Sequence, residues 1–393
     1  MKRKRESTKG QGDKSKKANV PIVNRQLKPI ISTFTSVSFI NGHKMDTQGS
    51  FCSRISLSKK LNVENAASIL INSLAIVVLM KDGIVHEARI KGSSDVKLNI
   101  NALSQIPVIS SLPKIKFIAA NNNSTLFIDI AGQVWGKGEV YCLGDIGEVR
   151  KSRVHREREY KEKPFVTEPT KVTVFHSLWE APVLEPPKFT QLAISGNHEV
   201  LLDENGNVWS SGMNDQGQLG LADQVFRYHP FLLEGIPKMQ FVAVGDTSSF
   251  FLDFEGNVWA CGDNDRGTLG LGDRFARHHP DKIENLPPIK YISVMKNYAL
   301  FLDIEGRVWA TGCNRRKTIS NDDAEILLVP KLVSKDLEIT FVETEANGFY
   351  LLDNTGLVWA RGRAEYYAAG SLIAPKQGAQ FMPLTQVFDI NTV

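Results

Sequence analysis

Few residues of this sequence are spaced as chemistry requires, and each of them also fits a structural role. Asp263–Gly267 (DNDRG) begins like a calcium-binding loop, but Arg274 stands at the twelfth position, where such a loop needs a bidentate Glu. The corresponding segment Met213–Gly217 lacks the pair of acids. His229 and His278-His279 each precede a proline in corresponding segments, which favours a structural role. We therefore expect no metal site.

Motifs for catalysis are missing as well. The sequence holds no GxSxG, no HExxH and no phosphate-cradling GxxxxGK[ST]. Four cysteines form neither a CxxC pair nor a zinc spacing and are expected to be buried free thiols of an intracellular protein: Cys52, Cys142, Cys261 and Cys313. No apolar run reaches the length of a membrane span. The sequence predicts a protein that is not an enzyme, needs no cofactor and contacts no membrane.

Basic side chains gather at the N-terminus. Residues 1–20 hold eight Lys and Arg against two acidic residues, a net charge of +6, so the rest of the chain sums to −2 within the total of +4. This polar, aperiodic stretch is predicted to be a disordered tail. Its two basic clusters resemble a nuclear import signal and can also contact nucleic acid weakly; a merely solubilising tail is the alternative. The cluster residues are Lys2, Arg3, Lys4, Arg5, Lys14, Lys16 and Lys17.

A repeated segment organises the remainder of the chain. The tryptophans of its last four copies recur every 50 residues, and a period of 20 to 50 residues indicates a solenoid or a propeller. Their shared position predicts that they pack between neighbouring repeats. The copies are 127–138 (FIDIAGQVWGKG), 202–212 (LDENGNVWSSG), 251–262 (FLDFEGNVWACG), 301–312 (FLDIEGRVWATG) and 351–362 (LLDNTGLVWARG).

Each copy predicts a β-hairpin. Asp203 can accept a hydrogen bond from the backbone two residues on, and Gly206 can take the left-handed conformation that closes the turn. The strand before the turn is continuously apolar, as suits a strand covered on both faces. A proline (Pro230, Pro280 or Pro330) is then followed by another short apolar strand. About four short strands per 50 residues make one blade of an all-β propeller.

Counting the units predicts a seven-bladed propeller of antiparallel strands. Trp135 marks the third unit, and His86 stands in the tryptophan place 49 residues earlier. Cys52 stands in that place of a first unit, only 34 residues before His86. The first two blades are therefore degenerate. Either Pro29–Phe39 or Phe381–Val393 is expected to close the ring.

One interval within the predicted propeller domain, residues 21–393, is too long. Trp135 and Trp209 lie 74 residues apart, which is 24 more than the period. The excess predicts a loop insertion around residues 148–173, and such loops often carry function. A solvated loop without a partner is the alternative. The candidate partner-binding residues are Arg150, Lys151, Arg153, Arg156 and Arg158, with Trp179 beside the insertion.

The repeat resembles that of the regulator of chromosome condensation family. Gly196–Gly220 carries its pattern best and Gly245–Gly270 nearly as well, ending in Gly-x-Leu-Gly. The two later units keep the first half and lose that ending. The resemblance is good over about residues 120–390 and poor over 30–110, and it implies a seven-bladed propeller.

The resemblance also implies a kind of function. The founding member is a nucleotide exchange factor for the small GTPase Ran and binds nucleosomes, with a basic N-terminal tail and an inserted wedge on one face. The tail and the insertion of this chain are similar in kind, without a residue-by-residue match. We thus expect a protein partner, such as a small GTPase or histones, and a nuclear location. The alternative is a scaffold or inhibitor propeller that binds an unrelated protein without exchange activity.

Overall fold

The computed structural model describes fourteen stretches of the chain. It divides the chain into the units Met1–Phe34 and Thr35–Val393, and every described residue belongs to the second unit. Within the described residues, no helix has the length and apolar character that crossing a membrane requires. The stretches are 37–39, 66–71, 75–89, 106–121, 123–143, 148–149, 164–176, 183, 185–320, 323–334, 337–345, 348–356, 358–362 and 382–383.

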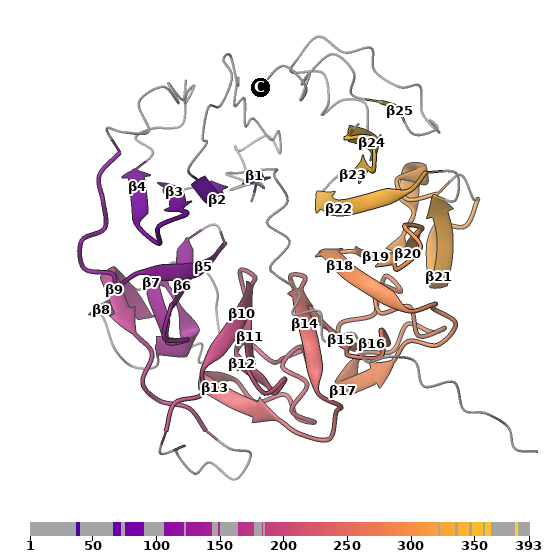
Figure 1. Ribbon diagram of the computed structural model, residues 1–393. Helices are drawn as coiled ribbons and strands as arrows, with labels where there is room; N and C mark the ends of the chain where they lie inside the picture. The colour runs from indigo at the N-terminus through magenta and orange to yellow at the C-terminus, as the bar shows by residue number, and fades with distance from the viewer. Residues whose placement is uncertain are drawn as a thin grey trace, which may run out of the picture. The chain divides into compact units, whose positions relative to one another are not determined.

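The described strands form six sheets that follow one another in chain order, from indigo to yellow in Figure 1. The last four sheets are simple antiparallel meanders. The third sheet holds β10 (Phe189–Ile194), β11 (His198–Asp203), β12 (Val208–Gly212) and β13 (Arg227–Leu233). The fourth holds β14 (Met239–Val244), β15 (Ser248–Asp253), β16 (Val258–Gly262) and β17 (Arg277–Lys282). The fifth holds β18 (Ile289–Met295), β19 (Tyr298–Asp303), β20 (Val308–Cys313) and β21 (Ile326–Ser334), and the sixth β22 (Ile339–Glu345), β23 (Gly348–Asp353), β24 (Val358–Gly362) and β25 (Met382–Pro383).

The first two sheets depart from this pattern. In the first, β1 (Val37–Phe39) pairs in parallel with β2 (Ala66–Ile71), which β3 (Ala75–Met80) and β4 (Val85–Arg89) follow. In the second, a fifth strand pairs with the outer strand. This sheet holds β5 (Ile115–Ala120), β6 (Ser124–Asp129), β7 (Val134–Glu139), β9 (Pro164–Lys171) and, outermost, β8 (Glu148–Val149). Two short 3-10 helices, η2 (Tyr141–Leu143) and η3 (Arg315–Lys317), follow β7 and β20.

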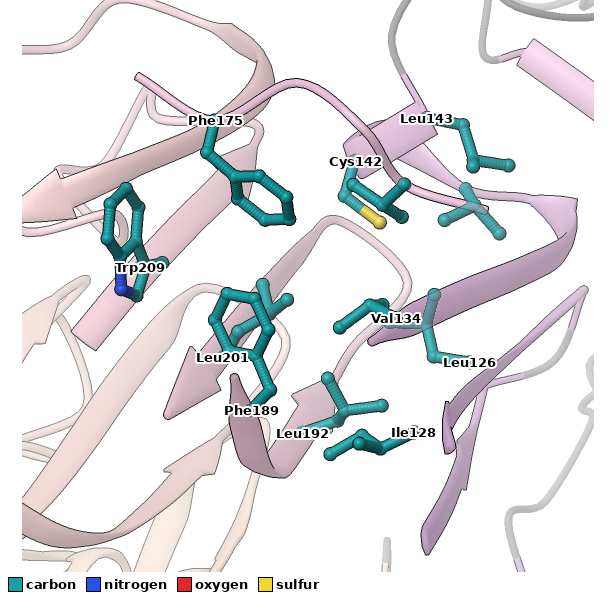
Figure 2. Packing of buried hydrophobic residues seen from close by; sticks show 12 residues of the cluster. Leu126, Ile128, Val134, Cys142, Leu143, Phe175, Phe189, Leu192, Leu201 and Trp209 are labelled. Carbon is teal, nitrogen blue, oxygen red and sulfur yellow. The ribbon is translucent and has the colours of Figure 1, made fainter. Parts of the chain in front are cut away.

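The core lies between neighbouring sheets. Trp209 of the third sheet packs edge-on against Phe175 and Phe189, with ring centroids 5.9 and 6.4 Å away, in a cluster shared with Leu126 and Val134 of the second sheet (Figure 2). Each later tryptophan likewise lies against the cluster that joins its sheet to the sheet before it. The predicted packing of tryptophans between repeats is confirmed.

The predicted hairpin turn is also confirmed. The carboxylate Oδ1 of Asp203 accepts hydrogen bonds from the backbone N–H of Asn205 and of Asn207, both at 2.9 Å. Gly206 closes the turn at φ +76°. A Cβ at this position would also lie 2.9 Å from the backbone oxygen of Met239, so the turn needs glycine for space as well as for conformation.

The fourth strands differ from the prediction. Pro230, Pro280 and Pro330 do not precede them but lie inside β13, β17 and β21, and His229 and His278-His279 are strand residues too. Proline cannot donate a ladder hydrogen bond, so it is tolerated in a strand at the edge of a sheet. These three strands are the outermost of their sheets, which explains why proline recurs in them.

Six sheets are described, against the seven units counted in the sequence. The unit around Cys52 lies outside the described residues, so seven blades remain a prediction. His86 occupies the expected place, since it pairs with Val78 as Trp135 pairs with Phe127. Of the two segments expected to close the ring, the described parts are β1, which pairs with β2, and β25, which pairs with β24.

Candidate interaction surface

The predicted site residues lie outside the described residues. This holds for the insertion residues Arg150, Lys151, Arg153, Arg156 and Arg158, for Trp179, and for Lys2, Arg3, Lys4, Arg5, Lys14, Lys16 and Lys17 of the tail. Residues 164–171, within the expected loop insertion of 148–173, form β9, the regular fourth strand of the second sheet, so this part of the range is not loop. The structure also describes the base of the insertion, namely η2 before it and β8, which pairs with β9. The insertion belongs to the connection between the third and fourth strands of the second sheet. In the meander this connection corresponds to residues 213–226 and 263–276 of the next two sheets.

A buried carboxylate holds the start of this connection. Glu199 of β11 is 1% exposed, and its Oε1 accepts the backbone N–H of Tyr141 at 2.9 Å. Its Oε2 accepts the hydroxyl of Ser211 at 2.8 Å. Both carboxylate oxygens are therefore used to fix η2 on the third sheet. Burying a polar group is costly unless it is hydrogen-bonded in this way.

In the neighbouring fourth sheet the corresponding side chain donates a hydrogen bond to the connection instead of accepting one. Ser249 stands where Glu199 stands one repeat earlier, and its hydroxyl donates to the carbonyl of Gln218 at 2.7 Å. Glu199 meets a backbone donor, the N–H of Tyr141, because the segment packed against it is η2 of the second sheet, which stands in place of the Gly-x-Leu-Gly ending. Sequence reasoning missed Glu199. The matching positions of the next three strands hold Ser249, Ala299 and Phe349, so an ionisable residue at this place was the signal that could have found it.

Aromatic side chains support the same base. The ring of Tyr141 meets Phe226 edge-on with centroids 5.2 Å apart, and Phe226 lies 4.3 Å from Tyr228. Gly212 passes so close that a Cβ there would lie 3.0 Å from the Tyr141 ring. The residues of η2 that lead into the insertion are therefore packed against the third sheet.

The corresponding connections of the next two sheets are fixed by asparagines. The Oδ1 of Asn214 accepts the N–H of Leu219 at 3.0 Å, and its Nδ2 donates to the carbonyl of Asp223 at 3.0 Å. Asn264 repeats both bonds with Leu269 and Asp273, each at 2.9 Å. The acidic segment around Asn264 thus has a structural use, because its amide closes the loop.

These two fixed connections present apolar side chains to solvent. Phe275 is 74% exposed and Val225, at the corresponding position, is 57% exposed. Arg277 stabilises the connection that carries Phe275 through ion pairs with Asp273 at 2.7 Å and Asp281 at 2.6 Å. Hydrogen bonding from Arg277 lowers the pKa of the Asp273 carboxyl, so this ion pair is charged at neutral pH. An exposed aromatic on a rigid loop is the kind of group that anchors a protein partner.

Buried titratable groups are used by the fold. His198 is 1% exposed; its Nδ1 lies 3.0 Å from the Ser195 hydroxyl and its Nε2 2.8 Å from that of Ser249. Burial lowers the pKa of His198 to about 3, so the imidazole is neutral and joins two neighbouring sheets. Burial likewise raises the pKa values of the Cys142 and Cys261 thiols, both free, as expected of the cysteines. Cys313, also free, is only half-buried, and Cys52 lies outside the described residues.

Successive antiparallel four-stranded sheets joined through shared cores define the β-propeller class. Residues 205–252 and 255–302 match the model of the regulator of chromosome condensation (RCC1) repeat, and residues 240–268 match a second model of the same repeat. The chain therefore carries repeats of the regulator of chromosome condensation family over residues 205–302. Among curated proteins, no significant match to the chain is found.

Solved structures show the same fold. Yeast RCC1 (Prp20) bound to Kap60 is 19% identical with a TM-score of 0.61, over 79% of this chain and 73% of that one. Prp20p from Saccharomyces cerevisiae, described with its binding to Gsp1p and histones, is 18% identical with a TM-score of 0.59, over 80% and 75%. Human WBSCR16 is 20% identical with a TM-score of 0.54, over 66% of this chain, which spans 64% of the human one. At these identities the likeness is one of fold.

Proposed function

We propose that this chain is a non-catalytic protein-interaction propeller that regulates a small GTPase by promoting nucleotide exchange. One observation carries the proposal: on an RCC1-repeat scaffold, the connection that bears the insertion is anchored at its base by the buried Glu199 carboxylate. A loop that pries open a nucleotide site needs a rigid base and no acid or base catalyst. The similarity to Prp20p, described with Gsp1p and histones, supports a partner of this kind.

The test is release of a fluorescent GDP analogue from Gsp1p. We expect micromolar full-length chain to accelerate release at least tenfold, and a variant with residues 150–163 replaced by a short Gly-Ser linker to lose that acceleration. Removal of residues 2–17 is the matched control, since it removes charge and deletes no described strand. Absence of both acceleration and binding by the full chain would refute the exchange proposal.

A second candidate, a scaffold without exchange activity, is favoured by the exposed Phe275 and Val225. It predicts a stable complex that leaves nucleotide release unchanged and weakens when Phe275 is replaced by Ala. Nuclear location through the basic tail belongs to the first candidate. It is tested by imaging the full chain beside the variant that lacks residues 2–17, and unchanged nuclear accumulation would contradict it.

A further inference from the structure

Among the described residues, segments of the chain pair with the outer edges of some sheets but not of others. In the second sheet, β8 covers part of the edge of β9. In the third sheet, His176 forms a parallel bridge to Phe231. The His176 N–H donates to the carbonyl of Pro230 and the His176 carbonyl accepts the N–H of Leu232, both at 2.9 Å. Two successive sheets are thus extended outward by segments of the chain itself.

The fifth sheet presents the same edge. Trp209 pairs with Leu232 in the third sheet, and Trp309 pairs with Leu332 in the fifth. The Pro330 carbonyl and the Leu332 N–H of β21 therefore correspond to the two groups that His176 satisfies. Among the residues that the structure describes, no backbone hydrogen bond from outside the sheet reaches either group. The fourth sheet has the corresponding groups at Pro280 and Lys282 of β17.

Side chains distinguish these two edges. The nine-residue strand β21 reads ILLVPKLVS, and its Val329 is 52% exposed. The loop that carries Phe275 docks beside it, since the N–H of Gly272 donates to the Leu328 carbonyl at 2.8 Å. By contrast, β17 is short and polar, reading RHHPDK. A long apolar edge with open backbone groups is a template for another strand.

We propose that the outer edge of β21 binds an extended segment of a partner protein by parallel strand addition, as His176 does on β13. The segment should be apolar, to cover Val329 and Phe275. In strand addition the main chain supplies affinity and alternate side chains supply specificity. The inference does not depend on exchange activity.

The probe is a random decapeptide display library panned against the full chain, followed by fluorescence anisotropy with the enriched peptides. We expect proline-free peptides with alternating apolar residues. Peptide binding should slow hydrogen exchange in the segment that contains Leu332. Leu332→Pro removes the outward N–H and should weaken binding at least tenfold. Lys282→Pro, the same backbone change on β17, is the matched control and should leave the affinity unchanged.

A side-chain variant keeps the test decisive if Leu332→Pro fails to fold. Val329→Glu, at an exposed position, should weaken the same peptides at least tenfold while the far-ultraviolet circular dichroism stays unchanged. No enriched peptide, or binding indifferent to both β21 variants, would overturn the proposal. Dimerisation of the chain that disappears in Leu332→Pro would also overturn it, because the edge would then serve a second copy. Nucleotide release by these variants is expected to match that of the parent chain.

Discussion

Trp259 donates its indole N–H to Oδ2 of Asp253, six residues earlier across the hairpin turn, at 3.1 Å. The same carboxylate orders the turn through Oδ1, so one Asp serves both the turn and the tryptophan. In the first sheet, Met80 stands in place of the Asp and His86 in place of the Trp, so neither partner of this bond is present. The bond recurs in four other sheets: Trp135–Asp129 at 3.0 Å, Trp209–Asp203 at 3.1 Å, Trp309–Asp303 at 3.0 Å and Trp359–Asp353 at 2.7 Å.

Asp253→Ala should lower the free energy of unfolding by about 2–4 kcal/mol, because it leaves the Trp259 N–H and the turn amides without their acceptor. Urea unfolding followed by tryptophan fluorescence measures this change. Glu255→Ala, an exposed change in the same turn, is the control and should stay within about 0.5 kcal/mol. Equal effects of the two changes would show that the Asp–Trp bond contributes nothing special.

Gly262→Ala should destabilise the protein by about 2–4 kcal/mol. Gly262 has φ +106°, and a Cβ there would lie 2.3 Å from the backbone oxygen of Thr247. Gly196→Ala is the matched control, since a Cβ at Gly196 meets nothing within 4 Å. Thermal unfolding of the two variants side by side gives the comparison, and a loss of the same size at Gly196 would contradict the steric argument.

His198 should make stability depend on pH. Burial lowers its pKa to about 3, against about 6.5 in an unfolded chain, so the unfolded state binds the extra proton as the pH falls below 6.5. Stability should therefore decline between pH 6.5 and pH 3, and His198→Gln should flatten that part of the profile. Urea midpoints at pH 8, 6 and 5 test this expectation. An identical slope in parent and variant would rule out a neutral buried His198.

Glu343 should act in the opposite pH direction. Burial raises its pKa to about 7, so its contribution to stability is intact below the unfolded value of about 4.3 and is lost as the pH rises through 7. Glu343→Gln should thus change little at pH 4 and stabilise the protein by about 1–2 kcal/mol at pH 8. Exposed Glu338→Gln is the control, measured by the same denaturant titration at both pH values. A destabilised Glu343→Gln variant at pH 8 would contradict the assigned cause.

The sequence alone determined the hairpins, the four-stranded period and the packing of the tryptophans. These features depend on residues within one repeat, where an Asp, a Gly and a run of apolar residues act over a few positions. The sequence also showed that the interval between Trp135 and Trp209 is too long, because the period is fixed, but it did not show which residues are extra, since residues 164–171 of the expected loop form β9. For Asp203, the sequence predicted the turn bond at Oδ1 but not the bond from Trp209 at Oδ2, which requires the second strand to be in register.

Only the tertiary structure decided how repeats meet. Glu199 receives the N–H of Tyr141 from 58 positions away, and His176 reaches the edge of β13, because neighbouring sheets bring these segments together. The placing of Pro330 inside β21 likewise depends on which strand lies outermost. Register and sheet order settle such contacts, and no local pattern of residues encodes them.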